Sequence, residues 1–200
     1  MLLEEDGEYV HMKCGVALIC RSWAITSGDC VRELKSGAKY TRRLKFGNMR
    51  WDHDLKGEVT VGVEQVIEHP YFDGGFHYDI ALIKMKSPVP ITEQIMPICL
   101  QNIDFDSITK HTNCFSAGWG KNSQTDSTRQ AHQAPITIVN PSNCAKMYAG
   151  KFSKTDMVCT GGSNRPCQGD GGAPLVSEYS PVIIMKKYFL KNKLCLKNVN

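Results

Sequence analysis

The chain has 200 residues, with 24 lysine and arginine residues against 20 aspartate and glutamate residues, which gives a net charge of +4. This length is enough for one domain that buries about 70% of the surface of the extended chain. The mild charge gives no indication of a nucleic-acid partner, and no apolar run is long enough to cross a bilayer. We therefore expect a globular domain with neither a nucleic-acid nor a membrane partner.

The cysteine content and the first residues point in different directions. Nine cysteines in 200 residues is a high number and indicates disulfides formed in an oxidising compartment. The segment from Met1 to Asp6, however, has neither the basic start nor the apolar core of a signal peptide. Either the natural N-terminus lies upstream, or the chain is an imperfect copy of a secreted protein. Because nine is odd, at least one thiol is free or bonded outside this chain.

Strand patterns dominate the chain. The basic stretch Lys39, Arg42, Arg43 and Lys45 is expected to be a solvated loop. Apolar and β-branched runs then predict strands at Val59–Ile67, Ile80–Ile83, Pro135–Val139 and Pro174–Val176, separated by glycine and proline turn signals. One short helix is predicted over Cys144–Tyr148, capped by Ser142 or Asn143 and ended by Gly150. Many short strands with frequent turns are typical of an all-β barrel or sandwich.

Six short motifs follow one another in order: Cys14–Ile19, Trp23–Cys30, Asp79–Lys84, Pro97–Leu100, Gly118–Gly120 and Gly169–Pro174. Together they resemble the trypsin/chymotrypsin-like (S1) serine protease family, which has Trp-Val-Leu-Thr-Ala-Ala-His-Cys at the second motif and Gly-Asp-Ser-Gly-Gly-Pro at the last. The resemblance implies an all-β, chymotrypsin-like double β-barrel. The family's motifs after Val176 do not appear, so the second barrel is expected to be incomplete at its C-terminal end.

The resemblance also implies a catalytic triad of which only one member is present. The mechanism needs a hydroxyl nucleophile, an imidazole that takes its proton and a buried carboxylate that orients the imidazole. Asp79 matches the retained aspartate. The histidine position holds Asp29 and the serine position holds Gly171. Without a hydroxyl no acyl-enzyme forms, and without an imidazole a restored serine would still lack its base.

Other parts of the site are carried over by the same resemblance. The backbone N–H groups of Gly169 and Gly171 match the oxyanion hole, because glycine keeps its amide. Asp170 matches the aspartate that pairs with the N-terminal ammonium after activation cleavage, and no Ile-Val-Gly-Gly-type site precedes Cys14, so the loop is expected to stay zymogen-like. Arg165 stands at the base of the specificity pocket, where a cation would repel lysine and arginine side chains of a substrate.

Two further chemistries are alternatives to this interpretation. Asp29 beside Asp79 would be a carboxylate pair sharing a proton, but nothing in the sequence supplies the fold of an aspartic protease. Asp52, His53, Asp54 and Glu58 lie near a loop in which some family members bind calcium, although their spacing is not diagnostic. We expect no metal and no cofactor.

The resemblance implies two disulfides, Cys14–Cys30 and Cys144–Cys159. Cys99 matches a cysteine that tethers an N-terminal segment in the family. Cys114 and Cys167 match cysteines whose partners lie in the family's C-terminal portion. Cys20 and Cys195 have no assigned counterpart. The expected organisation is an N-terminal remnant at 1–13, a truncated protease domain at 14–176 and a divergent tail at 177–200, in which Val182–Leu190 is a candidate substitute strand.

These features lead to three hypotheses on function. The first is a catalytically inactive serine protease homologue, most like the arthropod clip-type members, which is secreted and binds proteases or zymogens of an extracellular cascade such as innate-immune melanisation. The second is an active serine-type endopeptidase, and the third is a truncated fragment without function. The first is preferred because two triad positions are changed.

Overall fold

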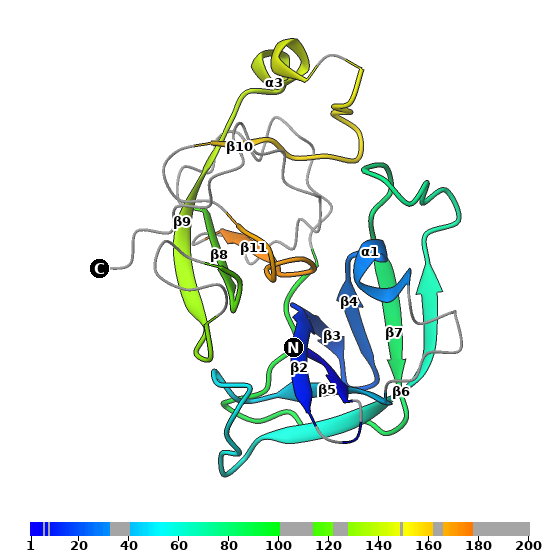
Figure 1. Cartoon of the computed structure of the whole chain (residues 1–200), viewed down its shortest axis with the longest axis vertical. Coiled ribbons are helices and arrows are strands. Elements are labelled where there is room, and N and C mark those ends of the chain that lie inside the picture. The colour runs from blue at the N-terminus through cyan, green and yellow to red at the C-terminus, as the bar shows by residue number, and fades with distance from the viewer. Residues whose placement is uncertain are drawn as a thin grey trace.

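The computed structural model of the chain (Figure 1) describes residues 1–5, 7, 9–32, 41–100, 114–121, 128–148, 150–161 and 166–177. Its first-half elements are β1 (Leu2–Glu5), β2 (Val10–Cys14), β3 (Ala17–Cys20), β4 (Trp23–Thr26), α1 (Gly28–Val31), β5 (Thr41–Phe46), β6 (Val59–Glu68) and β7 (Ala81–Met85). Its second-half elements are β8 (Cys114–Gly118), β9 (His132–Ile138), α3 (Pro141–Met147), β10 (Thr160–Gly161) and β11 (Leu175–Ser177). The described part contains no helix that is both long enough and apolar enough to span a bilayer.

The described strands form two antiparallel sheets that lie side by side (Figure 1). The first is seven-stranded, in the order β2-β1-β5-β6-β7-β4-β3, and it curls around a core that includes Leu2, Leu44 and Ile83, all fully buried. The alternation of buried and half-buried residues along β7 explains how one face of the strand is turned to this core. Residues 1–13, expected to be an N-terminal remnant, supply β1 and most of β2 of this sheet.

The expectation of a solvated basic loop is wrong for Arg42, Arg43 and Lys45, which lie on β5. Register explains why a strand tolerates them. Arg42 lies directly opposite Glu4 of β1, and its Nε donates to Glu4 Oε1 at 2.9 Å. Such opposed charges stabilise antiparallel pairs. Lys45 is buried on the strand, between Leu44 and Phe46 in sequence. Lys39 lies outside the described residues.

The second sheet is four-stranded, in the order β10-β9-β8-β11, and its core contains Ala134, Ile136, Val158 and Leu175. All four predicted strands occur, with ends that differ by a few residues. The predicted helix also occurs as α3, but it starts earlier. Its N-cap is Asn140, whose Oδ1 accepts from the Ser142 amide at 2.9 Å, and Pro141 follows as a first helical residue. The proposed caps, Ser142 and Asn143, lie inside the helix.

Asn140→Ala is expected to lower the free energy of unfolding by about 1 kcal/mol, because the Ser142 amide loses its acceptor at the helix start. Urea unfolding of the two proteins measures the difference. Asn143→Ala is the matched control, since Asn143 lies within the helix and does not cap it. Equal losses in the two variants would contradict the assignment of Asn140 as the cap.

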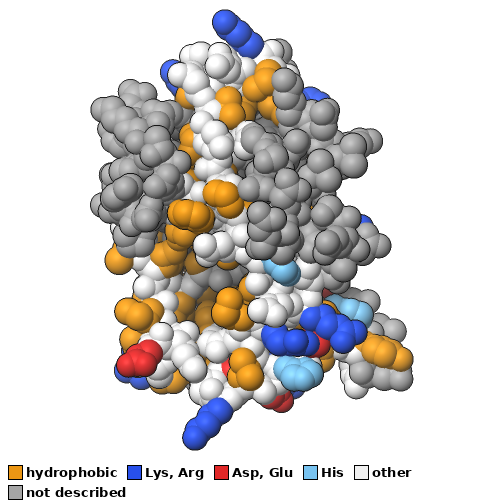
Figure 2. Space-filling model, turned by 90° about the vertical axis from the view of Figure 1, so that its left-hand side faces the viewer, with side chains coloured by type: hydrophobic (Ala, Val, Ile, Leu, Met, Phe, Trp, Pro, Cys, Tyr) orange, Lys and Arg blue, Asp and Glu red, His pale blue; other side chains and the backbone are white. Residues whose placement is uncertain are grey.

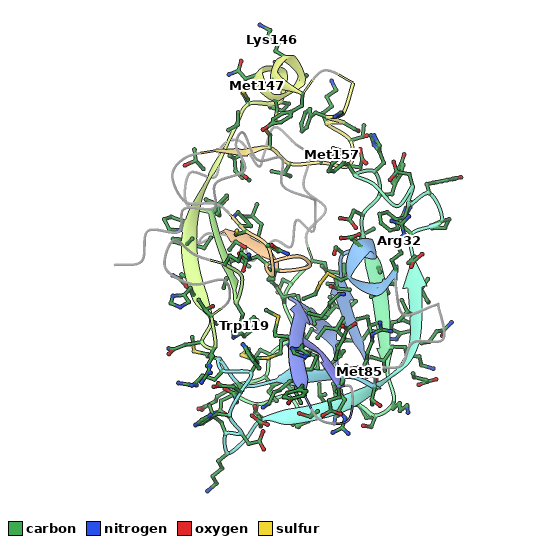
Figure 3. The ribbon with its side chains drawn as sticks, viewed as in Figure 1. Arg32, Met85, Trp119, Lys146, Met147 and Met157 are labelled. Carbon is green, nitrogen blue, oxygen red and sulfur yellow. A yellow bond between two sulfur atoms is a disulfide. The ribbon has the colours of Figure 1, made fainter. Side chains whose placement is uncertain are left out.

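Two indoles join the halves of the molecule. Trp119, at the end of β8, donates from Nε1 to the Met49 carbonyl at 2.7 Å, and Trp51 donates to the Thr128 carbonyl at 3.0 Å. Figure 3 places Trp119 between the two sheets. On the face that carries β9, charged side chains gather at the end where the first sheet lies (Figure 2). Because Met49 and Trp51 both belong to the 48–58 segment, these two hydrogen bonds link that segment of the first half to the second half.

Candidate functional site

A cleft of about 550 Å³ opens at the junction of the two halves. Both halves contribute to its walls, the first through β2 and α1 and the second through loops, and the lining residues are Met12, Lys13, Cys14, Asp29, Cys30, Trp119, Lys121, Cys167, Gln168, Gly169 and Gly171. It therefore brings together the histidine position, Asp29, and the serine position, Gly171, as the resemblance implies. A cleft of this size holds a small ligand or a few residues of a peptide.

Asp29 contacts Asp79 through its backbone amide. The short helix α1, absent from the sequence predictions, begins at its cap Ser27 and holds Asp29 in its first turn. The Asp29 amide donates to Asp79 Oδ1 at 2.8 Å. Asp79 is buried at 6% exposure, whereas the Asp29 side chain is exposed. Because the Asp29 side chain is exposed and the hydrogen bond to Asp79 Oδ1 comes from the Asp29 amide, the structure does not favour the carboxylate-pair hypothesis.

The loop before Gly171 has a defined peptide orientation. The Asp170 amide donates to the Cys167 carbonyl at 2.9 Å, and Gly169, third in this turn, has a φ of 95°. Together these describe a type II turn, which requires glycine at that place. The Gln168 carbonyl accepts from the Lys121 amide at 2.8 Å. In a trans peptide the N–H points away from the C=O, so the Gly169 N–H points away from Lys121 and toward the cleft that Gly169 lines.

The direction of the Gly171 N–H follows from the same trans-peptide geometry. The Asp170 carbonyl accepts from the Ala173 amide at 3.1 Å, which turns the Gly171 N–H to the opposite side. The carbonyl of Gly171 accepts from the Gly15 amide of the first half at 2.7 Å. A Cβ added at Gly171 would stand 3.4 Å from Cys30 Sγ and 3.6 Å from Cys14 Sγ, which is ordinary contact. The Cβ of a serine therefore fits this position without displacement.

Asp170 is buried at 3% exposure and is held by backbone donors. Its Oδ1 accepts from the Gly120 amide at 2.9 Å, and its Oδ2 accepts from the Cys167 amide at 2.8 Å. A side chain at either Gly118 or Gly120 would collide with this carboxylate, which explains the two glycines around Trp119. The amine of Met1 lies elsewhere, donating to the Lys45 carbonyl at 2.9 Å, and its burial lowers its pKa to about 5.

The two expected disulfides are present, Cys14–Cys30 beside the cleft and Cys144–Cys159 between α3 and the residue directly before β10. Cys167 is disulfide-bonded as well. Cys20 and Cys99 are exposed thiols, and burial raises the pKa of the Cys114 thiol. Arg165 and Cys195 lie outside the described residues, as does Val182–Leu190.

The loop considered for calcium is closed by a lysine. The ammonium of Lys45 donates to the His53 carbonyl at 3.0 Å and to Asp54 Oδ1 at 3.0 Å, and it lies 3.1 Å from Glu58 Oε1. An ammonium has three donors and this one meets three acceptors, whereas calcium takes six to eight oxygens. Asn48 ties the same loop by donating to the His53 carbonyl and to Glu58 Oε2, each at 2.6 Å.

Within the described residues, no group of three histidine, cysteine or acidic side chains is placed to hold a metal ion. The Lys45 ammonium supplies the positive charge that the oxygens of the 53–58 loop require. Sequence reasoning missed this role, because Lys45 was counted among solvated charges. The signal that would have found it is a lysine placed between two apolar residues, Leu44 and Phe46, in an extended segment.

A second polar contact joins the halves close to Asp79. Asp156, in the second half, accepts from His77 Nδ1 at 3.2 Å and from the Tyr78 amide at 3.1 Å. Burial acts to raise the pKa of Asp156, but the hydrogen bonds from Ser153, Tyr78 and His77 outweigh it and lower the pKa. Tyr78 has a φ of 52°, a strained value for a bulky residue. The turn before Asp79 is thus tied to the second half.

Asp156→Asn is expected to lower the free energy of unfolding by about 1–2 kcal/mol at pH 7, because its donors, among them His77 Nδ1 and the Tyr78 amide, lose a charged acceptor. The folded pKa of Asp156 lies below its unfolded value, so its contribution is fully present above about pH 4. It is lost as the pH falls through the lowered folded pKa. The difference between thermal melts of the two proteins should therefore shrink once the pH falls below about 4 toward the lowered folded pKa. A difference that grows on acidification would contradict this assignment.

Comparison with known proteins identifies the family. A sequence model of the trypsin family matches residues 3–188. Human kallikrein-11 is 30% identical over 94% of this chain and 70% of its own length. Human testisin is 32% identical over 81% of this chain, and the match spans 56% of its own length. Neuropsin, a serine protease expressed in the limbic system of mouse brain, superposes with a TM-score of 0.72 at 27% identity, over 91% of this chain and 78% of its own.

The neuropsin likeness confirms the chymotrypsin-like double-barrel fold, and the family match extends beyond residues 14–176 at both ends. The resemblance stated from six motifs is therefore confirmed at the level of the family. The arthropod clip-type likeness remains a prediction. The chain belongs to the trypsin family of S1 serine proteases.

Proposed function

We propose that this chain is a serine protease homologue without proteolytic activity, which acts as a binding or regulatory protein in an extracellular protease cascade. The observation that carries the proposal is the chemistry of the two triad positions in the cleft, where Asp29 replaces the base and Gly171 replaces the nucleophile. Acyl transfer requires an attacking oxygen from the protein and an imidazole to accept its proton. Neither is present at the position that the family uses.

The rest of the cleft supports a role in binding. Asp79 accepts from the Asp29 amide, Gly169 occupies a turn, and Asp170 is held by backbone donors. Loss of the two reactive side chains leaves this framework intact, because none of its hydrogen bonds uses them. A protein that keeps the shape of a protease and lacks its chemistry can engage a polypeptide without cutting it. We place the protein outside the cell on the strength of its disulfides, with proteases or zymogens as its partners.

The experiment is active-site labelling of the purified chain. We expect no covalent labelling by a fluorophosphonate and no turnover of a panel of peptide esters, while human kallikrein-11, treated in parallel, serves as a reagent control. Circular dichroism and a cooperative melt must first show that the chain is folded. Stoichiometric labelling of folded protein would overturn the proposal and favour an active endopeptidase. A folded but unreactive protein supports it.

A further inference from the structure

The Cys14–Cys30 disulfide forms part of the cleft wall. Cys14 ends β2 and Cys30 lies on α1, so the bond ties an edge strand of the first sheet to the helix that carries Asp29. The two cysteines are 6% and 5% exposed, and the open space beside them is the cleft. The cysteines of the Cys144–Cys159 disulfide, at 0% and 1% exposure, are fully buried. The two bonds therefore differ in how a dissolved thiol can reach them.

Glycine at residue 171 leaves the two sulfurs uncovered. A Cβ there would stand 3.4 Å from Cys30 Sγ and 3.6 Å from Cys14 Sγ. Apart from residues 170–172, no other heavy atom of the described residues lies within 4 Å of that position. Any side chain at 171, a serine included, would therefore cover the S–S bond on its cleft side. The glycine that removes the nucleophile also opens the disulfide to the cleft.

The hydroxyl of Ser27 makes one of the two sulfurs the better leaving group. Its Oγ donates to Cys30 Sγ at 2.9 Å and accepts from the Cys30 amide at 3.4 Å. A hydrogen bond to a charged acceptor is stronger than one to a neutral acceptor, so the hydroxyl stabilises negative charge that develops on Cys30 Sγ. In thiol–disulfide exchange, the sulfur that carries negative charge more readily leaves faster. Cys30 is therefore the leaving sulfur, and Cys14 is the sulfur that is attacked.

We propose that the Cys14–Cys30 disulfide is a thiol-exchange site, at which a low-molecular-weight thiol such as glutathione becomes bound to Cys14. The thiolate attacks Cys14 Sγ from the cleft and forms a new S–S bond, the Cys14–Cys30 bond breaks, and its electron pair leaves on Cys30 Sγ, which takes a proton from water. One thiol is consumed and one is formed, so no separate oxidant or reductant is needed. The product is a reversible mixed disulfide. This inference goes beyond the proposed function, because it concerns the disulfide and not the triad positions.

The first test is the rate at which each disulfide opens in the folded chain. Dithiothreitol is added at pH 8 without denaturant, opened cysteines are trapped with N-ethylmaleimide, and peptide mass spectrometry follows each bond. We expect Cys14–Cys30 to open at least about tenfold faster than Cys144–Cys159, at a rate proportional to the thiolate concentration, because the thiol attacks the folded state. Equal rates for the two bonds would overturn the inference. So would a rate that levels off at high dithiothreitol, which would show that the bond opens only through unfolding.

The second test locates the adduct. The exposed thiols of Cys20 and Cys99 are alkylated first, and the chain is then incubated with excess reduced glutathione and quenched with N-ethylmaleimide. We expect glutathione on Cys14 and maleimide on Cys30. The absence of an adduct, or an adduct on Cys30, would contradict the assignment. The same holds for an adduct on Cys167, the other disulfide-bonded cysteine of the cleft wall.

Variants separate exchange in the cleft from unfolding. Gly171→Ala covers the bond without backbone strain, since residue 171 does not have a left-handed φ, and should slow opening at least about fivefold. Ser27→Ala removes the donor to the leaving sulfur and should also slow opening about fivefold, whereas Ser27→Thr keeps a hydroxyl and should stay within about twofold of wild type. Ser27 also caps α1, so its loss loosens the helix. If the bond opened through unfolding, Ser27→Ala would therefore open faster, and that result would overturn the exchange site.

Discussion

A double variant, Gly171→Ser with Asp29→His, is expected to be labelled covalently by a fluorophosphonate, whereas each single variant stays unlabelled. A serine at 171 fits beside the Cys14–Cys30 disulfide, but without an imidazole its hydroxyl keeps the low reactivity of an alcohol. A histidine at 29 restores a base on a backbone that already donates to buried Asp79. Since a positioned base contributes about 10²–10⁴-fold, the double variant should react at least about 10²-fold faster than Gly171→Ser.

A small phosphonate suits this test because it needs only the nucleophile, the base and the oxyanion amides, and does not need a specificity pocket. Labelling rates by intact-protein mass spectrometry compare the three variants, and melts confirm that all are folded. Adding Asp79→Asn to the double variant is the control, because the orienting carboxylate is then lost and labelling should fall. Rapid labelling of Gly171→Ser alone would contradict the argument. An inert but folded double variant would show that the amides or Asp79 are misplaced.

The sequence predicted which positions form the site because the family motifs are local. Each motif is a short segment that can be recognised on its own: Asp79 before β7, Cys30 after Asp29, and Gly169 and Gly171 around Asp170. Because these segments follow one another in a fixed order, each can be assigned to its place in the fold. The same holds for the two disulfides, whose partners lie 16 and 15 residues apart. The fold class followed from the strand and turn patterns and from the motif order.

The parts that the sequence did not predict depend on contacts between distant segments. The direction of the Gly169 N–H is set by the Lys121 amide, and the carboxylate of Asp170 is satisfied by the Gly120 amide, 50 residues away. The expectation of a zymogen-like loop stays a prediction, and the structure adds that the Gly120 and Cys167 amides donate to the Asp170 carboxylate. The N-cap of α3, Asn140, was missed although the local sequence indicates it, because an asparagine followed by Pro141 is typical of a helix start.

Lys45 is the clearest case of a residue whose role depends on its surroundings. In composition it is one of 24 cations, and next to Arg42 and Arg43 it is typical of a solvated stretch. In the fold its side chain is 5% exposed, and that of its partner Glu58 is 12% exposed. Asp54, 94% exposed, adds little to the pair because water screens it. The ammonium and Glu58 therefore hold the 53–58 loop against the first sheet.

Lys45→Met is accordingly expected to lower the free energy of unfolding by about 3–5 kcal/mol, because Glu58 is left as a nearly buried charge without its cation. Urea unfolding at pH 7 measures the loss. Lys56→Met, in the exposed turn of the same loop, is the matched control and should change stability by less than about 0.5 kcal/mol. Adding Glu58→Gln to Lys45→Met should recover part of the loss, because the orphaned charge is removed. A loss as small as that of the control would contradict the role assigned to Lys45.

The pH and calcium dependence of the same pair provide an independent check. Burial acts to lower the pKa of Lys45, but its hydrogen bonds to Asp54 and Glu58 and their charges outweigh this and raise it above 10.5. Because the folded pKa is the higher one, the contribution of Lys45 is fully present at neutral pH and is lost only as the pH rises through that raised value. Calcium and chelators are both expected to leave the Tm of the protein unchanged, since an ammonium with three acceptors already fills the loop. A Tm that rises with added calcium would show that metal ions compete for these oxygens.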